Sequence, residues 1–554
     1  MRVFKNQPCG RNMKYNLAKD TKLLIAEDQV LAKSHLHYAL EQLGFSNMDY
    51  VDRPSTAIAS LQEREYDAII CSYNLRSDQG GYYLLEQLQS QNALSLTNAF
   101  IFTSADTSAE VVHAIIELQP DEFIAKPFSV NELDRRLSRV LSRKAALKNV
   151  YRCMDKGDHE KALYEVEQFL LQPEHAEHFP LAMKIKGDLL ILNERFSDAL
   201  AFYDAIINVQ DFSWAKLGIA NCLLALKEFD DAEREILQLA MRPDSELAAY
   251  DLLAKLKIQF DAFDDALECT NLACHISPRK VSRHQQAVNL ARITHNYENQ
   301  FSSAKQLVRY ARDSIHDTPD IYLNAARAGV DFAMTSAPED MNRIVKQSTS
   351  YLKQLKQAHP KASLKDELYV LDARLHYLKD DVAKAQSLLS DFHIDQAQHH
   401  STEALLDRAK ALHEVGLKDD SLKIFEALSH RLKKHEGSDD LMSRYIAQEQ
   451  EEKTAISLSP KALNNAAVSE YKRGNLEQSY STFSQAFRVM PKNPSIALNY
   501  LQAIIRARKS REALPADTRQ AIKSCRETLE SAQLSKEQLS RYETVKSILT
   551  NNGK

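Results

Sequence analysis

The stretch 21–143 alternates short apolar runs with longer segments in which apolar residues recur every three or four positions. The short runs favour buried strands, and the longer spacing favours amphipathic helices. Besides a strand–helix unit at about 49–65, the apolar runs are Leu23–Ala26, Ala68–Cys71, Ala99–Thr103 and Glu122–Ala125. Five strands that alternate with helices predict an α/β fold, a doubly wound five-stranded parallel sheet.

Polar side chains follow the predicted strands at the points where the strands end. In open α/β sheets these carboxyl ends share one edge, and that edge is where ligands bind. The residues that the pattern brings there are Glu27 and Asp28, Ser72, Ser104, and Lys126 before Pro127. Each residue alone is a weak signal, but their order along the chain is specific.

This order, with Tyr73-Asn74-Leu75 after the third strand, resembles the receiver domain of bacterial two-component response regulators over all of 21–143. In that family the third strand ends in an Asp that accepts a phosphoryl group from a sensor histidine kinase, with Mg²⁺ bound beside it. The resemblance implies metal ligands at Glu27 and Asp28, phosphoryl contacts from Ser104 and Lys126, and a switch aromatic at Phe123.

Ser72 stands where the family has its acceptor Asp. A serine hydroxyl brings no charge to a metal site and does not form an acyl phosphate. We therefore expect a degenerate receiver in which Lys126 pairs with Glu27 or Asp28, with no cofactor beyond weakly bound Mg²⁺. Two alternatives stay open: Asp78 in the following loop substitutes as the acceptor, or Ser72 is an engineered replacement.

Apolar positions continue in helical spacing beyond the receiver, with no Gly or Pro before Gly157, which predicts a connecting helix over 133–155. Further on, a Phe-x-Asp-Ala pattern begins at Phe196, Phe229 and Phe263, at spacings of 33 (196 to 229) and 34 (229 to 263) residues. Such a period, with two amphipathic helices per unit, resembles the tetratricopeptide repeat (TPR). We expect an all-α TPR superhelix over 146–504, an irregular insert at 430–459 and a helical C-terminal cap at 505–554.

A TPR superhelix holds a peptide or helix of a partner protein in its concave groove. In this resemblance the second, fifth and ninth residues of each unit's first helix face the groove. The candidates are Lys184, Asp188, Trp214, Leu217, Asn221, Asp251, Lys255, Asn464 and Val468. Each of them is also consistent with an ordinary solvated residue, and the single Trp with a core residue.

Composition narrows the function classes. The net charge is −5, from 71 basic and 76 acidic residues, and both signs are interspersed, which argues against a nucleic-acid face. No stretch approaches the 18 or so apolar residues of a membrane span. The seven cysteines are scattered and indicate reduced thiols of a cytoplasmic protein. Residues 1–20 are basic and predict a flexible tail, and no catalytic constellation stands outside the receiver.

These observations predict a non-enzymatic regulator of two-component signalling with a protein-binding TPR output. The domain order resembles the VieB type of auxiliary response regulator, which implies that the chain modulates phosphotransfer between a sensor histidine kinase and another response regulator. The alternative is a TPR scaffold or assembly adaptor whose receiver is only structural. A phosphorylation-switched adaptor is a third possibility, if Asp78 substitutes or Ser72 is not native.

Overall fold

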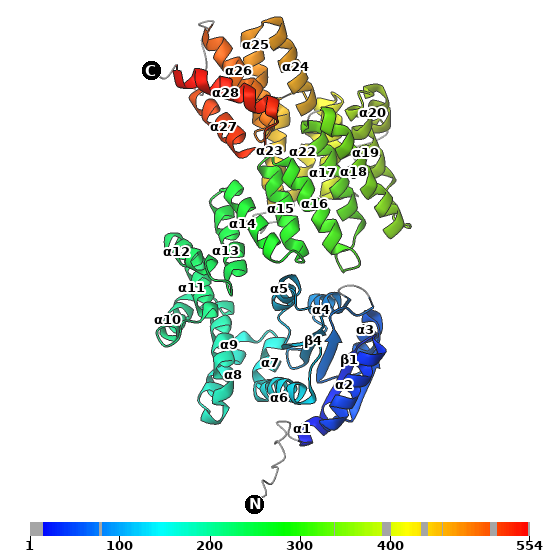
Figure 1. Ribbon diagram of the computed structural model, residues 1–554, viewed down its shortest axis with the longest axis vertical. Coiled ribbons are helices and arrows are strands. Elements are labelled where there is room, and N and C mark those ends of the chain that lie inside the picture. The colour runs from blue at the N-terminus through cyan, green and yellow to red at the C-terminus, as the bar shows by residue number, and fades with distance from the viewer. Residues whose placement is uncertain are drawn as a thin grey trace, which may run out of the picture. The chain divides into compact units, whose positions relative to one another are not determined.

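The computed structural model describes residues 15–76, 80–336, 338–390, 400–433, 441–456, 458–509 and 518–551. The chain forms two compact units (Figure 1). The first comprises Met1–Ala262 with Glu268–Lys280, and the second Phe263–Leu267 with Val281–Lys554. The first unit contains the sheet and the first helix pairs, whereas the described part of the second is helical throughout.

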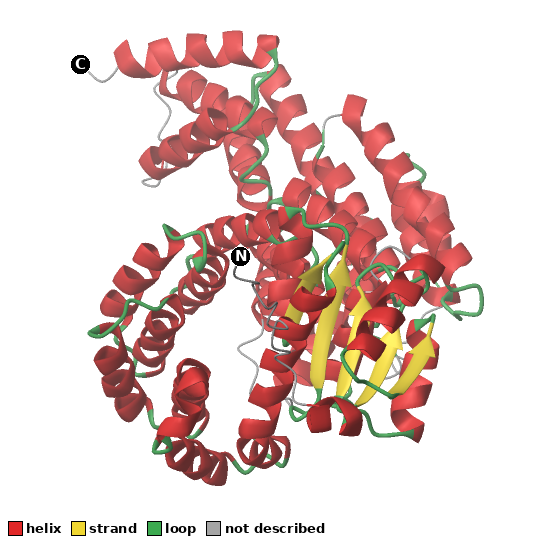
Figure 2. Cartoon of the chain, turned by 60° about the horizontal axis from the view of Figure 1, so that its bottom comes forward, coloured by secondary structure: helices red, strands yellow, loops and turns green. Residues whose placement is uncertain are grey.

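Five parallel strands form the sheet, in the order β2-β1-β3-β4-β5, and appear as yellow arrows in Figure 2. They are β1 (Lys22–Ala26), β2 (Asn47–Val51), β3 (Ala68–Ser72), β4 (Ala99–Ser104) and β5 (Glu122–Ala125). The helices that follow them are α2 (Val30–Gln42), α3 (Pro54–Glu63), α4 (Gly80–Ser90), α5 (Ala109–Leu118) and α6 (Val130–Ala146). The predicted doubly wound parallel sheet is confirmed.

Alternate residues of each strand pack against helices on opposite faces of the sheet. Leu23 and Ile25 of β1 share one core with α2 and α6, whereas Leu24 and Ala26 share the other with α3, α4 and α5. In the register of the sheet, Ala26 lies opposite Cys71 of β3. The residues that end or follow these two strands therefore emerge side by side at one edge.

Two expectations for the flanks of the receiver are corrected. Residues 15–20 of the predicted flexible tail form helix α1 (Tyr15–Asp20), because Ala18 is buried in the sheet core; residues 1–14 lie outside the described part. The predicted connecting helix over 133–155 is broken at Leu147, where α6 ends and α7 (Lys148–Asp155) begins. Leu133 packs in the sheet core and Val150 in the repeat core, so the break lies where one core gives way to the next.

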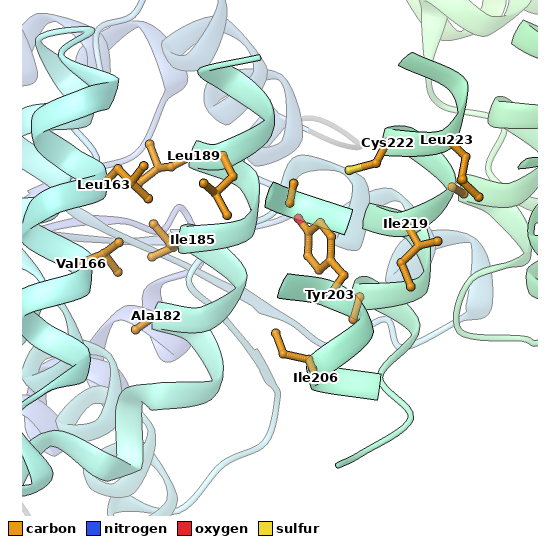
Figure 3. Packing of buried hydrophobic residues seen from close by; sticks show 14 of the residues in the cluster. Leu163, Val166, Ala182, Ile185, Leu189, Tyr203, Ile206, Ile219, Cys222 and Leu223 are labelled. Carbon is orange, nitrogen blue, oxygen red and sulfur yellow. The ribbon is translucent and has the colours of Figure 1, made fainter. Parts of the chain in front are cut away.

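Helix pairs complete the first unit. They are α8 (His159–Leu170), the 3₁₀ turn η1 (Pro173–His178), α9 (Phe179–Leu192), α10 (Phe196–Ile207), α11 (Ser213–Ala225), α12 (Phe229–Ala240), α13 (Glu246–Gln259) and, from Glu268 on, α14 (Phe263–Ile276). Tyr203 of α10 fills the space beside Gly187 of α9 and Gly218 of α11. Figure 3 shows its ring among other buried residues of the same core. A Cβ atom added at Gly187 would lie 2.4 Å from the Tyr203 hydroxyl, and one added at Gly218 would lie 2.3 Å from the Tyr203 ring. Paired helices approach closely here because the residue opposite the large ring is glycine.

The second unit continues the helix pairs. Its further helices are α15 (Val281–Ile293), α16 (Tyr297–Ala311), α17 (Pro319–Thr335), α18 (Pro338–Ala358), α19 (Lys365–Leu378), α20 (Val382–Leu389), α21 (Thr402–Glu414), α22 (Lys418–Lys433), α23 (Leu441–Ala455), α24 (Pro460–Arg473), α25 (Leu476–Val489), α26 (Pro494–Lys509), α27 (Thr518–Ser531) and α28 (Lys536–Asn551). The all-helical repeat region agrees with the prediction.

Two boundaries in this unit differ from the expected ones. The irregular insert predicted at 430–459 contains helix α23, and Tyr445 and Ile446 anchor that helix in the core. The sequence showed no sign of this helix because its many charged residues suggested a solvated segment, whereas several of them are buried in ion pairs. Residues 434–440 and 457 lie outside the described part. The predicted cap at 505–554 holds α27 and α28, but position 505 falls inside α26.

Candidate functional site at the edge of the receiver sheet

Lys126 joins the ends of β1 and β3. Its ammonium nitrogen lies 2.5 Å from Oε2 of Glu27 and 3.5 Å from the Ser72 hydroxyl oxygen. Glu27 is buried, and its second carboxylate oxygen accepts a hydrogen bond from the Gln29 amide at 3.1 Å. The structure thus brings three of the predicted pocket residues together around one internal ion pair, which is the pairing that the sequence predicted.

Ser104 and Phe123 lie on the neighbouring strands. The buried Ser104 hydroxyl accepts a hydrogen bond from the Asp106 amide at 3.0 Å, and its carbonyl accepts one from the Lys126 amide at 2.7 Å. Phe123 is half-buried against the core that contains Tyr73. The hydrogen bonds of Ser104 therefore hold the loops after β4 and β5 in place.

A magnesium ion requires several oxygen ligands, most of them charged. Here Glu27 is already held by the Lys126 ammonium, and Ser72 contributes only a neutral hydroxyl. One Asp28 carboxylate oxygen is buried without a hydrogen-bond partner in the described structure. No group of three or more His, Cys, Asp or Glu side chains converges as a metal site among the described residues. The pocket fits Mg²⁺ poorly; Asp78 lies outside the described residues.

The predicted groove residues differ in exposure. Asp188, Asn221 and Lys255 are exposed, while Lys184 and Asp251 are half-buried. Burial raises the pKa of the Asp188 carboxyl, against the opposing effect of the Lys184 ammonium. Asp188 is thus reached by solvent and is also surrounded by protein, as expected for a residue on a concave surface.

Trp214, Leu217 and Val468 are half-buried and pack against the cores. The Trp214 ring lies 6.2 Å from that of Tyr203, edge to face. Asn464 lines a cavity of about 320 Å³, and its side-chain oxygen is buried without a hydrogen-bond partner within the described chain. The groove assignment stays a prediction, strongest for the exposed positions.

A buried ionic network in the second unit was not predicted. Arg374 of α19 lies 2.7 Å from both Asp331 and Asp407 and 2.6 Å from Glu414. Lys410 of α21 lies 3.0 Å from Asp331. All five side chains are at least nine-tenths buried. They come from α17, α19 and α21, so the network ties three helices of neighbouring pairs together.

The network shifts the pKa values of its members. Burial acts to raise the pKa of Asp331, but the cations Lys410 and Arg374 outweigh it and lower that pKa. Burial raises the pKa of Glu414 despite the Arg374 guanidinium. Beside them, burial and then Lys453 lower the pKa of His413 to about 4. His413 is therefore neutral near pH 7, and its Nε2–H donates to the Ile456 carbonyl at 2.8 Å.

Comparison with known proteins matches the first part of the chain. Residues 23–138 match the family described as response regulator receiver domain. Chemotaxis protein CheY-3 of Vibrio cholerae is 24% identical over 127 residues, which are 23% of this chain and 96% of that protein. Transcriptional activator protein IrlR of Burkholderia pseudomallei is 30% identical over 122 residues, 22% of this chain and 51% of that protein.

Among solved structures, a tetratricopeptide repeat protein from Parabacteroides merdae is similar at 14% identity and a TM-score of 0.26, over 49% of this chain and 98% of that one. The N-terminal part of the chain is a response regulator receiver domain of the CheY-like class. The described part of the remainder is all-helical, and its sequence period of 33 and 34 residues resembles that of the TPR. A receiver places the protein in two-component signalling. Among the described residues, no helix is long and apolar enough to cross a membrane.

Proposed function

We propose that this protein regulates two-component signalling through a receiver that docks partners but does not accept a phosphoryl group. The observation that carries the proposal is the Lys126–Glu27 ion pair beside Ser72. A neutral hydroxyl at the strand end is not an acyl-phosphate acceptor. With the lysine and the glutamate already paired, the pocket supports a structural role for both.

The docking surface that we propose is the exposed side of α2. Histidine kinases contact receivers of this family mainly through the helix after the first strand and the adjacent loops. Here Leu31 is 86% exposed and Tyr38 58% exposed, with His35 between them on the same helix. The His35 ring lies 5.5 Å from Phe128, which follows the Lys126–Pro127 loop. An apolar patch beside the strand-end loops is suited to a helical partner.

A receiver that docks a kinase without removing its phosphoryl group acts as a decoy. Occupancy by this chain lowers the kinase available to the true regulator, by an amount set by its concentration relative to Kd. A second contact through the TPR-like repeats raises the effective affinity. The protein is thus proposed to restrain phosphotransfer from a cognate sensor kinase to another response regulator, as the VieB-type domain order suggests.

A reconstituted phosphotransfer assay tests the proposal. Adding the protein in excess over the kinase is expected to slow transfer to the cognate regulator, and the Leu31→Glu variant is expected to lose that effect. Leu171→Glu is the matched control, since Leu171 is a 73% exposed leucine at the end of α8, away from α2 in sequence. If phosphotransfer is undiminished at saturating concentrations of this protein, and no complex with the kinase forms, the proposal is wrong and the scaffold function takes its place.

Labelling with a small phosphodonor and Mg²⁺ tests the acceptor separately. We expect no acyl phosphate on the wild-type chain. Stoichiometric labelling of a carboxylate, Asp78 included, would favour a phosphorylation-switched adaptor instead.

A further inference from the structure

Three of the four residues after α14, namely Ser277, Arg279 and Lys280, contact the receiver. Ser277 donates a hydrogen bond from its hydroxyl to Glu117 of α5, and Lys280 lies 3.7 Å from the same carboxylate. Arg279 lies 3.2 Å from Glu110, which is about two turns before Glu117 on the same face of α5. The segment Ser277–Lys280 is also where the first compact unit ends and the chain passes into the second. The contact therefore joins the receiver to the segment at which the helical repeats pass from the first unit to the second.

Arg279 reaches the edge of the strand-end pocket. Its guanidinium carbon lies 5.7 Å from the centre of the Tyr73 ring, and Tyr73 is the residue after Ser72. Arg279 is only 9% exposed, and Tyr73 is fully buried. Burial raises the pKa of the Tyr73 hydroxyl to about 12, and the guanidinium opposes that shift. The two side chains therefore cover each other.

The contact is incompletely satisfied. Within the described chain, the Tyr73 hydroxyl and two guanidinium nitrogens of Arg279, Nε and Nη1, are buried without a hydrogen-bond partner. Buried polar groups without partners lose the hydrogen bonds that water would give them. The contacts that stabilise it include the Ser277–Glu117 hydrogen bond, the ion pairs of Arg279 and Lys280 with α5, and the cation–π contact of Arg279 with Tyr73. Each of these is of modest strength. The unpaired groups offset part of this stabilisation, so the contact opens more readily than a fully hydrogen-bonded one would.

We propose that Ser277–Lys280 is an intramolecular latch that holds the end of α14 against Tyr73 and α5 of the receiver, and that it opens while both parts stay folded. Opening uncovers Tyr73 and the acidic side of α5, which the closed latch hides. It also frees the segment that leads into the second unit. The latch adds a regulated surface to the receiver that is independent of docking on α2.

Hydrogen–deuterium exchange of the full-length protein tests the latch. Arg279→Glu places two carboxylates against each other at Glu110, so we expect exchange across Ala109–Leu118 to rise about tenfold or more, the size expected for losing a hydrogen bond to a charged group. Exchange in β1 and β3 is expected to stay unchanged. Glu110→Arg in the Arg279→Glu background is expected to restore part of the protection.

Arg234→Glu is the matched control, because Arg234 makes an exposed ion pair with Asp231 elsewhere in the first unit. It changes the net charge equally and is expected to leave α5 unaffected. Unchanged exchange of α5 in Arg279→Glu would overturn the latch. Faster exchange throughout the sheet would also overturn it, because Arg279 would then be part of the fixed receiver core.

Discussion

Gly187→Ala should destabilise the native protein, and truncating the Tyr203 side chain should remove that destabilisation. In the native protein, a Cβ at position 187 would lie 2.4 Å from the Tyr203 hydroxyl, well inside van der Waals contact. Gly187→Ala therefore forces the ring, or one of the two helices, to shift. The tyrosine is 1% exposed, with little room to move.

The magnitudes follow from this packing. Overpacking of this kind costs about 1–3 kcal/mol, reduced by about 1 kcal/mol because alanine is the better helix former. Tyr203→Ala alone should cost about 3–5 kcal/mol, the range for truncating a large buried aromatic. In that background the clash is gone, so Gly187→Ala should be neutral or stabilising by up to about 1 kcal/mol. The expected coupling energy is about 1–3 kcal/mol.

The chain carries its own reporter for this measurement. Trp214 is the only tryptophan, and its ring lies 6.2 Å from that of Tyr203. Urea unfolding followed by tryptophan fluorescence therefore reports the transition of these helix pairs, whatever the rest of the chain does. The four proteins of the double-mutant cycle are compared by the free energy of that transition.

Equal costs of Gly187→Ala with and without Tyr203 would refute the packing argument. Gly157→Ala serves as the control, since no atom outside its chain neighbours lies within 4 Å of a Cβ there. Its φ of +70° gives the variant a backbone cost of its own. That cost should not depend on Tyr203.

Ser72→Asp adds a carboxylate beside Glu27 and should bind Mg²⁺ at millimolar concentrations more tightly than the wild type by calorimetry; unchanged binding would contradict the pocket assignment. Arg374→Met deprives the buried Glu414 of its ion pair with Arg374 and leaves Asp331 and Asp407 with one fewer cation each, so it should destabilise the second unit by about 3–5 kcal/mol in thermal melts. Arg343→Met breaks only an exposed pair and should cost at most about 1 kcal/mol. The lowered pKa of His413 means that the unfolded chain binds its proton more readily, so stability should fall as the pH drops from about 6.5 to about 4. His413→Gln should flatten that pH dependence; an unchanged slope would show that other groups cause it.

The receiver was predictable because its signals are local. Leu23–Ala26 is a continuous apolar run that predicted a buried strand, and its residues are all apolar because alternate ones pack into the cores on opposite faces of the sheet. The polar residue at each strand end then followed from parallel topology alone. The approach of Lys126 to Glu27 needed only that topology, although 99 residues separate them.

The buried network was not predictable in the same way. Arg374 and Asp407 lie on different helices 33 residues apart, and each sits in a stretch whose charges resemble a solvated face. Nothing in the spacing along one helix reveals that its charged residue meets a partner from another. The helix break at Leu147 was not predicted for a related reason. The apolar spacing continues through Leu147, but the buried apolar residues before it pack in the sheet core and those from it onward pack in the repeat core.

The hydrogen bond from Ser277 to Glu117 joins residues 160 positions apart. Domains fold as units during synthesis, the N-terminal one first, at about 5–20 residues per second. The receiver is therefore complete on the order of ten seconds before α14 leaves the ribosome. During that interval Tyr73 and α5 of every nascent chain are uncovered, so a partner that binds this face meets its best opportunity while the protein is still being made.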